Sequence, residues 1–224
     1  MPSLDYKSKP ADIFLIAGGP DSKNHSAILA GALALIKKKA PSVAYIGTAN
    51  SDNKEFFLML KQIIMDAGAG SVTLVPIVRR FDSDKAKDIL LASDIVFISG
   101  GDVDIGMKYL RKRNLIIFFK ELYYNRGKLF CGISAGAIML CRNWMHWRDP
   151  DDDSTVELLD CLGFAPLLCD VHDEEDNWME IKRLLGFFPQ GTIGYGIPAE
   201  GALRVSPDGK ITAIGSAPIQ FIKS

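Results

Sequence analysis

The sequence predicts an α/β fold in which a parallel sheet is covered by helices on both faces. Short runs rich in Val, Ile, Leu and Phe alternate along the chain with stretches of helical length. These runs are continuously apolar, as is typical of strands that are buried on both faces. Glycine pairs such as Gly18-Gly19 and Gly100-Gly101 follow some of them. Parallel sheets place their sites beyond such strand ends.

Four strand-and-helix repeats are expected before the middle of the chain. The expected strands are residues 12–17, 43–46, 72–75 and 94–99. The expected helices are residues 26–39, 54–67 and 83–92, with further helical segments to about residue 125. Three lysines end the first helix, which suits the negative end of a helix dipole. Ser83 is the expected N-cap of the third helix.

The pattern becomes richer in strands toward the C-terminus. Residues 149–153 form an acidic loop, which we interpret as a solvated turn, and residues 174–185 are an expected helix. Strands are then expected at residues 193–197, 202–206, 211–214 and 219–222. Pro207-Asp-Gly209 is typical of a hairpin turn. No repeat or linker divides the chain, so we expect a single domain over residues 1–224.

The segment Gly132-Ile-Ser134-Ala-Gly136 fits the G-x-S-x-G pattern of a nucleophile elbow. Apolar residues 129–131 precede it and apolar residues 137–140 follow it, as a strand, a tight turn and a helix require. In an elbow the turn exposes the serine hydroxyl, and the glycines prevent clashes with neighbouring elements. The alternative is an ordinary tight turn with a buried serine. We interpret Ser134 as a candidate nucleophile.

A serine nucleophile needs a base, and the chain has only three histidines. His172 follows an apolar run and precedes a helix, which suits the rim of a sheet better than the positions of His25 and His146. A carboxylate should orient the imidazole. Glu200, between turn-forming residues, is the first candidate, and Asp149 is the second.

An oxyanion hole at this turn would need two backbone amides. The Ala135 amide follows the serine directly. The Gly101 amide, after the fourth expected strand, is the natural second donor; the alternative is a tight turn without a ligand. No metal or organic cofactor is expected.

Composition excludes several classes of partner. With 26 basic and 27 acidic residues the net charge is −1, so neither nucleic acid nor an anionic membrane is an expected partner. No apolar run approaches the ~20 residues of a membrane span. The polar N-terminus lacks a signal-peptide core, so we expect a cytoplasmic protein. The four cysteines, at positions 131, 141, 161 and 169, are expected to be free thiols.

These residues together resemble the serine peptidase family that contains aspartyl dipeptidase (dipeptidase E) and cyanophycinase. The resemblance covers most of the chain and rests on four segments in order: Gly100-Gly101-Asp102, Gly132-Ile-Ser134-Ala-Gly136-Ala137, His172 and Gly196-Ile-Pro-Ala-Glu200-Gly201. It implies a Ser134–His172–Glu200 triad and an oxyanion hole from the Gly101 and Ala135 amides. It also implies a three-layer α/β/α sandwich like that of class I glutamine amidotransferases, and members often form homodimers.

The sequence departs from the family pattern in two places. The segment before Glu200 has one extra residue, so Asp149 stays as the alternative acid. Aspartyl-specific members carry arginines in the helix after the histidine, whereas residues 173–176 here are all acidic. A basic or neutral N-terminal substrate residue is therefore at least as plausible as an aspartyl one. Trp147 and Trp178 are possible pocket residues, although core packing is the commoner role.

We therefore expect a serine peptidase that acts on dipeptides or other small peptides. Two alternatives remain: a cyanophycinase-like hydrolase of an Asp–Arg polymer, and an inactive binding protein on the same scaffold. A glutamine-hydrolysing subunit is disfavoured because Cys131 lies inside the strand, three residues before the elbow position.

Overall fold

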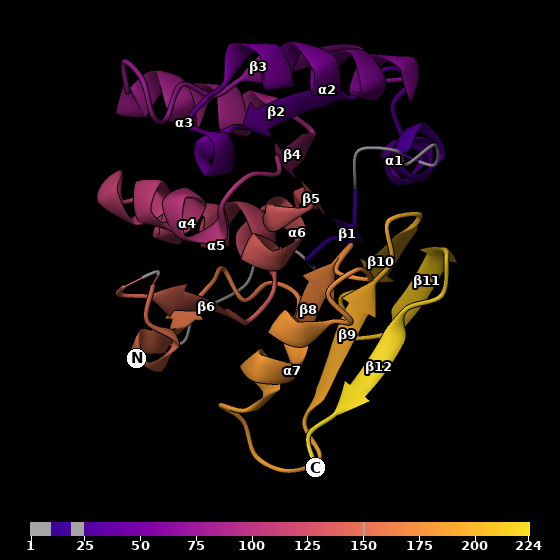
Figure 1. Ribbon diagram of the computed structural model, residues 1–224. Coiled ribbons are helices and arrows are strands. Elements are labelled where there is room, and N and C mark those ends of the chain that lie inside the picture. Colours follow the sequence, from indigo (N-terminus) through magenta and orange to yellow (C-terminus); the bar gives the residue numbers. More distant parts are fainter. Residues whose placement is uncertain (1–9, 19–24, 150) are drawn as a thin grey trace.

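A seven-stranded sheet forms the centre of the computed structural model, which describes residues 10–18, 25–149 and 151–224 (Figure 1). Its strand order is β11-β10-β1-β5-β4-β2-β3. The five strands from β1 to β3 in this order run parallel, whereas β10 pairs antiparallel with β1 and β11. The bounds are β1 (Ile13–Ile16), β2 (Ser42–Ile46), β3 (Ser71–Leu74), β4 (Ile95–Ile98), β5 (Leu129–Ile133), β10 (Gly201–Val205) and β11 (Ile211–Gly215).

Helices cover both faces of this sheet. Successive residues of a strand point to opposite faces, so each buried strand contributes side chains to an apolar core on either side. In β1, Ile13 and Leu15 belong to one apolar core, and Phe14 and Ile16 belong to the other. The second core includes α1 (His25–Ala34) and α2 (Lys54–Asp66). The first core includes α3 (Ser83–Ala92), α4 (Val103–Lys112), α5 (Ile116–Lys120), the π-helical turn η2 (Glu121–Asn125) and α6 (Ala135–Leu140). The predicted three-layer arrangement is thus confirmed.

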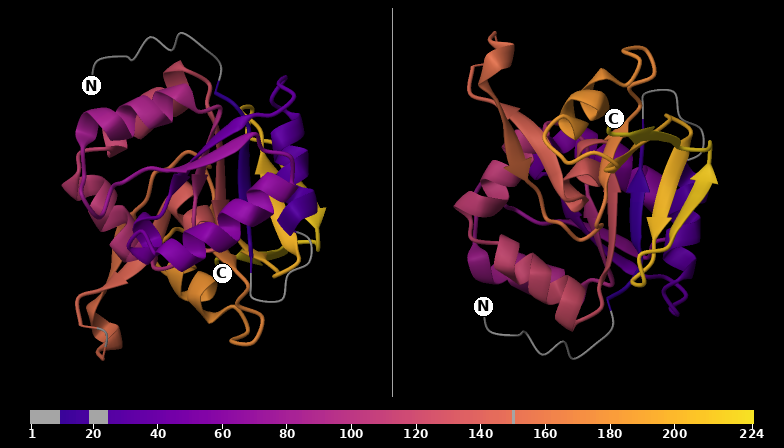
Figure 2. Two further views of the ribbon diagram at one scale, coloured as in Figure 1. Left: turned by 90° about the horizontal axis from the view of Figure 1, so that it is seen from above. Right: turned by 90° about the horizontal axis from the view of Figure 1, so that it is seen from below.

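A second, three-stranded sheet stands beside the main one, in the order β12-β9-β8. Its strands are β8 (Leu168–Val171), β9 (Ile193–Ile197) and β12 (Ile219–Ile222), and α7 (Met179–Leu185) packs on it (Figure 1). A separate hairpin consists of β6 (Asn143–Trp147) and β7 (Val156–Asp160). Both views in Figure 2 show this hairpin projecting from the rest of the molecule. Short 3₁₀ turns are η1 (Thr48–Asn50) and η3 (Asp153–Thr155).

The expected strands of the parallel sheet are confirmed, but three details of the helices are wrong. The first helix ends at Ala34, because the amides of Leu35 and Ile36 bond carbonyls three residues back and tighten the last turn. Its lysines therefore lie outside it. The cap of α3 is Asp82, whose carboxylate accepts from the amides of Asp84 and Lys85. Helix α7 starts only at Met179.

The sequence did not predict β6, β7 or β8 as strands. Strand β7 is largely exposed, so its sequence lacks the apolar run that marks a buried strand. The expected hairpin turn after residue 206 is confirmed, since β10 pairs with β11 and Gly209 has φ 81°. Gly19, expected at a strand end, and residue 150 of the acidic loop lie outside the described ranges.

The remaining structural expectations concern thiols and membranes. All four cysteines are free, and three of them are buried, as predicted. Within the described ranges, no helix combines the length and apolarity that crossing a bilayer requires.

Candidate active site

Ser134 lies at the junction of β5 and α6 with an unusual backbone conformation. Its φ is 53° and its ψ is −125°, a combination that L-residues rarely adopt. Such a residue costs on the order of 1–3 kcal/mol and persists only where its surroundings enforce it. The Ser134 amide donates to the carbonyls of Ile16 (2.9 Å) and Ala17 (3.1 Å), which ties the turn to the end of β1. A nucleophile elbow requires a sharp strand-to-helix turn of this kind at its serine.

The glycines of the elbow permit close packing that no other residue would allow. A Cβ on Gly132 would lie 2.2 Å from the Gly136 carbonyl oxygen, and a Cβ on Gly136 would lie 2.1 Å from that of Ile98. A Cβ on Gly100 would lie 3.0 Å from the Ser134 Cβ. Helix α6 therefore presses directly on β4 and β5, and the loop after β4 reaches the serine.

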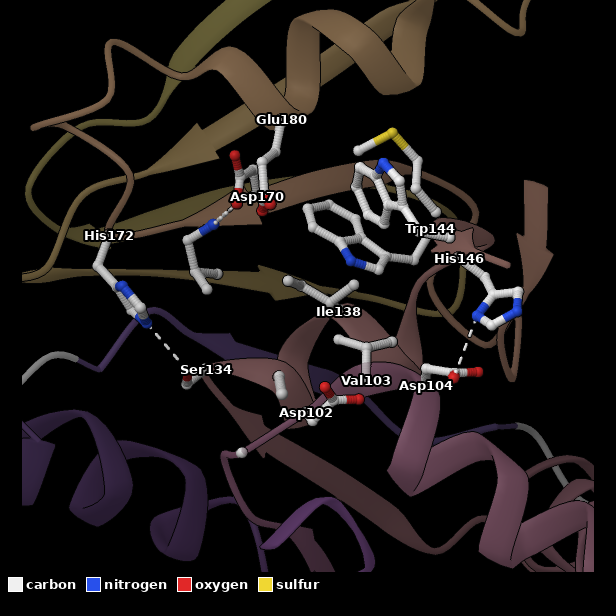
Figure 3. Close-up of a pocket in the computed structure, with 15 residues that line it drawn as sticks. Asp102, Val103, Asp104, Ser134, Ile138, Trp144, His146, Asp170, His172 and Glu180 are labelled. Carbon is white, nitrogen blue, oxygen red and sulfur yellow. Dashed lines mark hydrogen bonds and ion pairs between the residues drawn. The ribbon is translucent and has the colours of Figure 1, made fainter. Parts of the chain in front are cut away.

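His172 is in hydrogen-bond contact with Ser134. Its Nε2 lies 2.9 Å from the Ser134 Oγ (Figure 3). The residue follows β8 directly and has φ 46°. Its amide donates to the Ile197 carbonyl at 2.9 Å, so β9 holds the turn that presents the ring. The structure thus brings together two side chains that are 38 residues apart in the chain.

Glu200 lies at the same rim of the sheet. It follows β9 and precedes β10, whose first residue, Gly201, accepts a 3.0 Å hydrogen bond from the Ala17 amide. Ala17 in turn accepts from Ser134, so the strand ends that carry these residues are directly connected. The Glu200 carboxylate also acts on His25: burial lowers the pKa of that imidazole, and Glu200 opposes the shift.

Asp149 lies in the loop between β6 and β7 and is not among the residues that line a cavity with Ser134. Its Oδ1 accepts from the Asp151 amide at 3.1 Å, and its own amide donates to the Thr155 hydroxyl at 3.0 Å. These bonds hold the loop itself. Within the described ranges, no hydrogen bond or ion pair joins Asp149 to His172.

The amides of Gly101 and Ala135 belong to residues that line one cavity with Ser134. The Gly100 carbonyl accepts from the Asn50 side chain at 3.1 Å. Because a trans peptide is planar, this bond turns the Gly101 N–H the opposite way, away from Asn50. Gly101 has φ 140°, and a Cβ there would lie 2.2 Å from the Ala49 carbonyl oxygen. Sequence reasoning did not single out Asn50.

The cavity beside Ser134 has a volume of about 540 Å³. Figure 3 shows Ser134 and His172 near one end of the view and Trp144 and His146 near the other. His146 contacts Asp104 there, with 3.1 Å between Nδ1 and Oδ2. Trp147 lines the cavity as well, whereas Trp178 is buried in the core.

Two further carboxyl groups line this cavity, and sequence reasoning missed both. Asp170 is only 2% exposed. Burial first, and then the charges of Asp173 and Glu180, raise its pKa to about 8. The pKa of Glu180 is also raised, by partial burial and then by Asp173 and Asp176. A single charged residue inside the apolar run before His172 was the available signal for Asp170.

No set of three or more His, Cys, Asp or Glu side chains in the described part of the chain is arranged to hold a metal ion.

The model of peptidase family S51 matches residues 13–213. Among solved structures, a peptidase from an acI-B1 actinobacterium superposes with a TM-score of 0.65 at 15% identity, over 97% of this chain and 96% of that chain. A protein provisionally described as peptidase E from Listeria monocytogenes EGD-e superposes with a TM-score of 0.68 at 15% identity, over 93% of this chain and 100% of that chain. At such identity the superpositions support the shared fold. No curated protein matches this chain.

Proposed function

The chain belongs to peptidase family S51, and from this premise we propose that it is a serine peptidase acting on dipeptides or other small peptides. Ser134 is the nucleophile and His172 is the general base. One observation carries the proposal: the Ser134 Oγ lies 2.9 Å from the His172 Nε2, at an elbow with a strained serine. A buried structural serine would need neither the strained backbone nor the imidazole.

The contact between Ser134 and His172 supports the acylation step. As the hydroxyl attacks the scissile carbonyl, its proton moves to the His172 Nε2. The carbonyl oxygen becomes an oxyanion, and we assign its stabilisation to the amides of Gly101 and Ala135. Ala135 is the first residue of α6, so its amide has no partner within the helix. Such a donor is typically worth 10²–10³-fold in kcat.

Collapse of the tetrahedral intermediate breaks the C–N bond, and His172 returns the proton to the leaving amine. The acyl group then remains on the Ser134 oxygen. A water molecule attacks it, gives its proton to His172, and the second tetrahedral intermediate releases the acid and regenerates the hydroxyl.

We assign Glu200 as the acid that orients His172, with Asp149 as the alternative. The backbone bonds between Ala17, Gly201 and Ser134 support Glu200, because they fix its turn at the rim. The loop bonds of Asp149 weigh against that residue. A carboxylate in this role holds the imidazole tautomer and stabilises the imidazolium.

Substitution of the triad members tests this mechanism on a dipeptide library. We expect Ser134→Ala to lower kcat by at least about 10⁴-fold, since the covalent step is lost. Glu200→Gln should cost on the order of 10⁴-fold, as in other triads, whereas Asp149→Asn should stay near the wild type. Ser154→Ala, in the exposed turn η3, is the matched control.

A fluorophosphonate probe gives an independent reading of the serine. It should label the wild type and the Ser154→Ala control but not Ser134→Ala. An unlabelled wild type without turnover would favour the inactive binding protein. Full turnover by Ser134→Ala would refute the assigned nucleophile.

A cyanophycinase-like activity is a second candidate, favoured by the acidic cavity. Carboxylates at Asp170 and Glu180 suit the arginine side chains of an Asp–Arg polymer. Release of Asp–Arg dipeptides from the polymer at a rate above that for free dipeptides would favour this candidate.

A further inference from the structure

The ionisable side chains along the cavity beside Ser134 are nearly all acidic. The acidic residues that line it are Asp102, Asp104, Asp170 and Glu180. Among its described lining residues there is no lysine and no arginine. His146, the one titratable base besides His172, already faces Asp104. A cavity of this kind attracts cations and repels the aspartyl carboxylate that aspartyl-specific relatives accept.

Asp170 distinguishes this cavity from an ordinary acidic surface, because its carboxyl group is buried. Its Oδ1 accepts from the Val171 amide at 2.8 Å. Its Oδ2 is buried and has no hydrogen bond of normal geometry among the described residues, although the Ile181 amide lies close enough to lower the pKa of this carboxyl group. A buried polar atom without a partner costs about 1–3 kcal/mol, and more when it is charged. An incoming donor would remove that cost.

Glu180 extends the same wall toward solvent. Figure 3 shows Asp170 and Glu180 together on one side of the cavity, and the charge of Glu180 contributes to the raised pKa of Asp170. Asp170 is enclosed, whereas Glu180 on α7 is exposed. Two carboxylates at different depths can receive the several N–H donors of one guanidinium, or an ammonium group between them.

One arginine, Arg183, lines an adjoining cavity together with Asp170 and Glu180, and its charge partly opposes the rise in the Glu180 pKa. Arg183 makes a two-pronged ion pair with Asp153, with N–O distances of 2.7 and 2.8 Å, and its guanidinium lies 6.0 Å from the centre of the Trp147 ring. In the described ranges, no hydrogen bond or ion pair joins it to Asp170. Arg183 is thus paired with Asp153, and the described residues that line the cavity beside Ser134 supply carboxyl acceptors without a lysine or arginine among them.

The remaining walls suit the hydrocarbon part of a long cationic side chain. Val103, Ile138 and Trp144 line the same cavity, and in the view of Figure 3 they lie on the opposite side of Ser134 from His172. Apolar side chains pack against the methylenes of lysine or arginine while the charge reaches a polar tip. An indole nearby also attracts cations.

We propose that Asp170 and Glu180 bind the guanidinium or ammonium side chain of a substrate residue next to the scissile bond, which makes this protein selective for arginyl or lysyl peptides. The inference rests on the proposed peptidase function, because it places the substrate against Ser134. It assigns specificity to residues outside the triad.

The test compares arginine with citrulline, its neutral isostere, on both sides of the scissile bond. The substrates are Arg-Ala, citrulline-Ala, Ala-Arg and Ala-citrulline, and the readout is kcat/KM. We expect the arginyl peptide of at least one pair to be preferred by tenfold or more. Asp170→Asn should abolish that preference and Glu180→Gln should weaken it. Glu175→Gln, an exposed carboxyl outside the cavity lining, is the matched control and should keep it.

A binding measurement separates failure of the pocket from failure of the peptidase. Titration calorimetry on Ser134→Ala needs no turnover and should show tighter binding of the arginyl peptide. If the wild type hydrolyses no peptide while this preference holds, the proposed function fails and the pocket stands. If peptides are hydrolysed but arginine and citrulline are equal in rate and affinity, the pocket proposal is overturned.

Two further outcomes would also overturn it. One is recognition of the peptide's free α-amino group alone. In that case N-acetylation should lower the affinity equally for the arginine and the citrulline peptide. The other is tight binding of Ca²⁺ or Mg²⁺ that Asp170→Asn removes.

Discussion

Ser134 combines a reactive position with a costly backbone. Its φ of 53° and ψ of −125° suit glycine, whereas alanine would keep the strain. The backbone conformation that directs the Ser134 hydroxyl toward His172 therefore reduces the stability of the fold. Active sites commonly store strain of this kind.

We expect Ser134→Gly to be more stable than Ser134→Ala, although both lack the hydroxyl. Relief of backbone strain should exceed the extra entropy of an unfolded glycine, for a net gain of about 1 kcal/mol in the free energy of unfolding. Urea denaturation of the two variants measures the difference. Equal stability would show that the elbow holds no strain.

Asp170 should make stability depend on pH. Its pKa is raised to about 8 in the fold by burial and by Asp173 and Glu180, against a usual 3.8. Between these values the folded state holds a proton that the unfolded state has released. This group's contribution to stability is therefore greatest below pH 4 and falls as the pH rises to about 8.

Asp170→Asn should remove this dependence. The difference in the free energy of unfolding between Asp170→Asn and the wild type should shift in favour of the variant on going from pH 5 to pH 8. The expected shift is at least about 1.4 kcal/mol, the equivalent of one pKa unit. Thermal unfolding at both values checks this, with Glu175→Gln as the control. A constant difference across the range would show that Asp170 titrates normally.

At the scale of elements, the elbow depends on how closely α6 approaches β4. No other residue can replace Gly136 without a clash, since a Cβ there would lie 2.1 Å from the Ile98 carbonyl oxygen. Gly31, on the exposed side of α1, is the opposite case, because a Cβ there would meet nothing within 4 Å.

Gly136→Ala should therefore cost about 3 kcal/mol or more in the free energy of unfolding, through overpacking against main chain. Gly31→Ala should instead stabilise the protein by about 0.5–1 kcal/mol, because alanine is the better helix residue. Denaturant titration of both variants tests the contrast. A mild effect of Gly136→Ala would mean that α6 can move away from the sheet.

The sequence predicted elements best where local pattern and burial agree. Strands β1, β2, β4 and β5 are continuous apolar runs, and the structure confirms them. Helix α7 starts later than expected because Asn177 and Trp178 adopt positive φ (51° and 60°). The Trp178 ring packs against Gly196, where a Cβ would lie 2.6 Å from it. That tertiary contact overrides the helical preference of the residues before it.

The site could be predicted only in part for a similar reason. Ser134 has a local signature, and His172 was selected from only three histidines. Asp170 and Asn50 act through spatial neighbours that no spacing in the sequence reveals. Asn50, for example, bonds the carbonyl of Gly100, 50 residues away in the chain.

At the scale of the whole molecule, the candidate pair of side chains joins two sheets. Ser134 belongs to the seven-stranded sheet, and His172 follows β8 of the three-stranded one. Helix α6 contacts both β5 and β8. One apolar core includes Ile13 of β1, Leu168 of β8 and Trp178, so the two sheets share an interior.

We expect the chain to unfold in one cooperative step, as a single domain over residues 1–224 would. Its three tryptophans, at positions 144, 147 and 178, report on the region around the cavity, whereas far-UV circular dichroism reports on all elements. The two signals should give the same midpoint in urea. An earlier fluorescence transition would show that the smaller sheet unfolds by itself.

The place of β1 between β5 and β10 has a consequence for how the polypeptide is made. Of these three strands, β1 emerges first from the ribosome, its parallel neighbour β5 emerges later, and β10 emerges last. Until then the central strand of the future sheet has bare amides and carbonyls along one edge, a surface on which nascent chains aggregate. The β10 segment must therefore be synthesised before both edges of β1 are paired, and a chaperone that shields this edge should raise the yield of active protein.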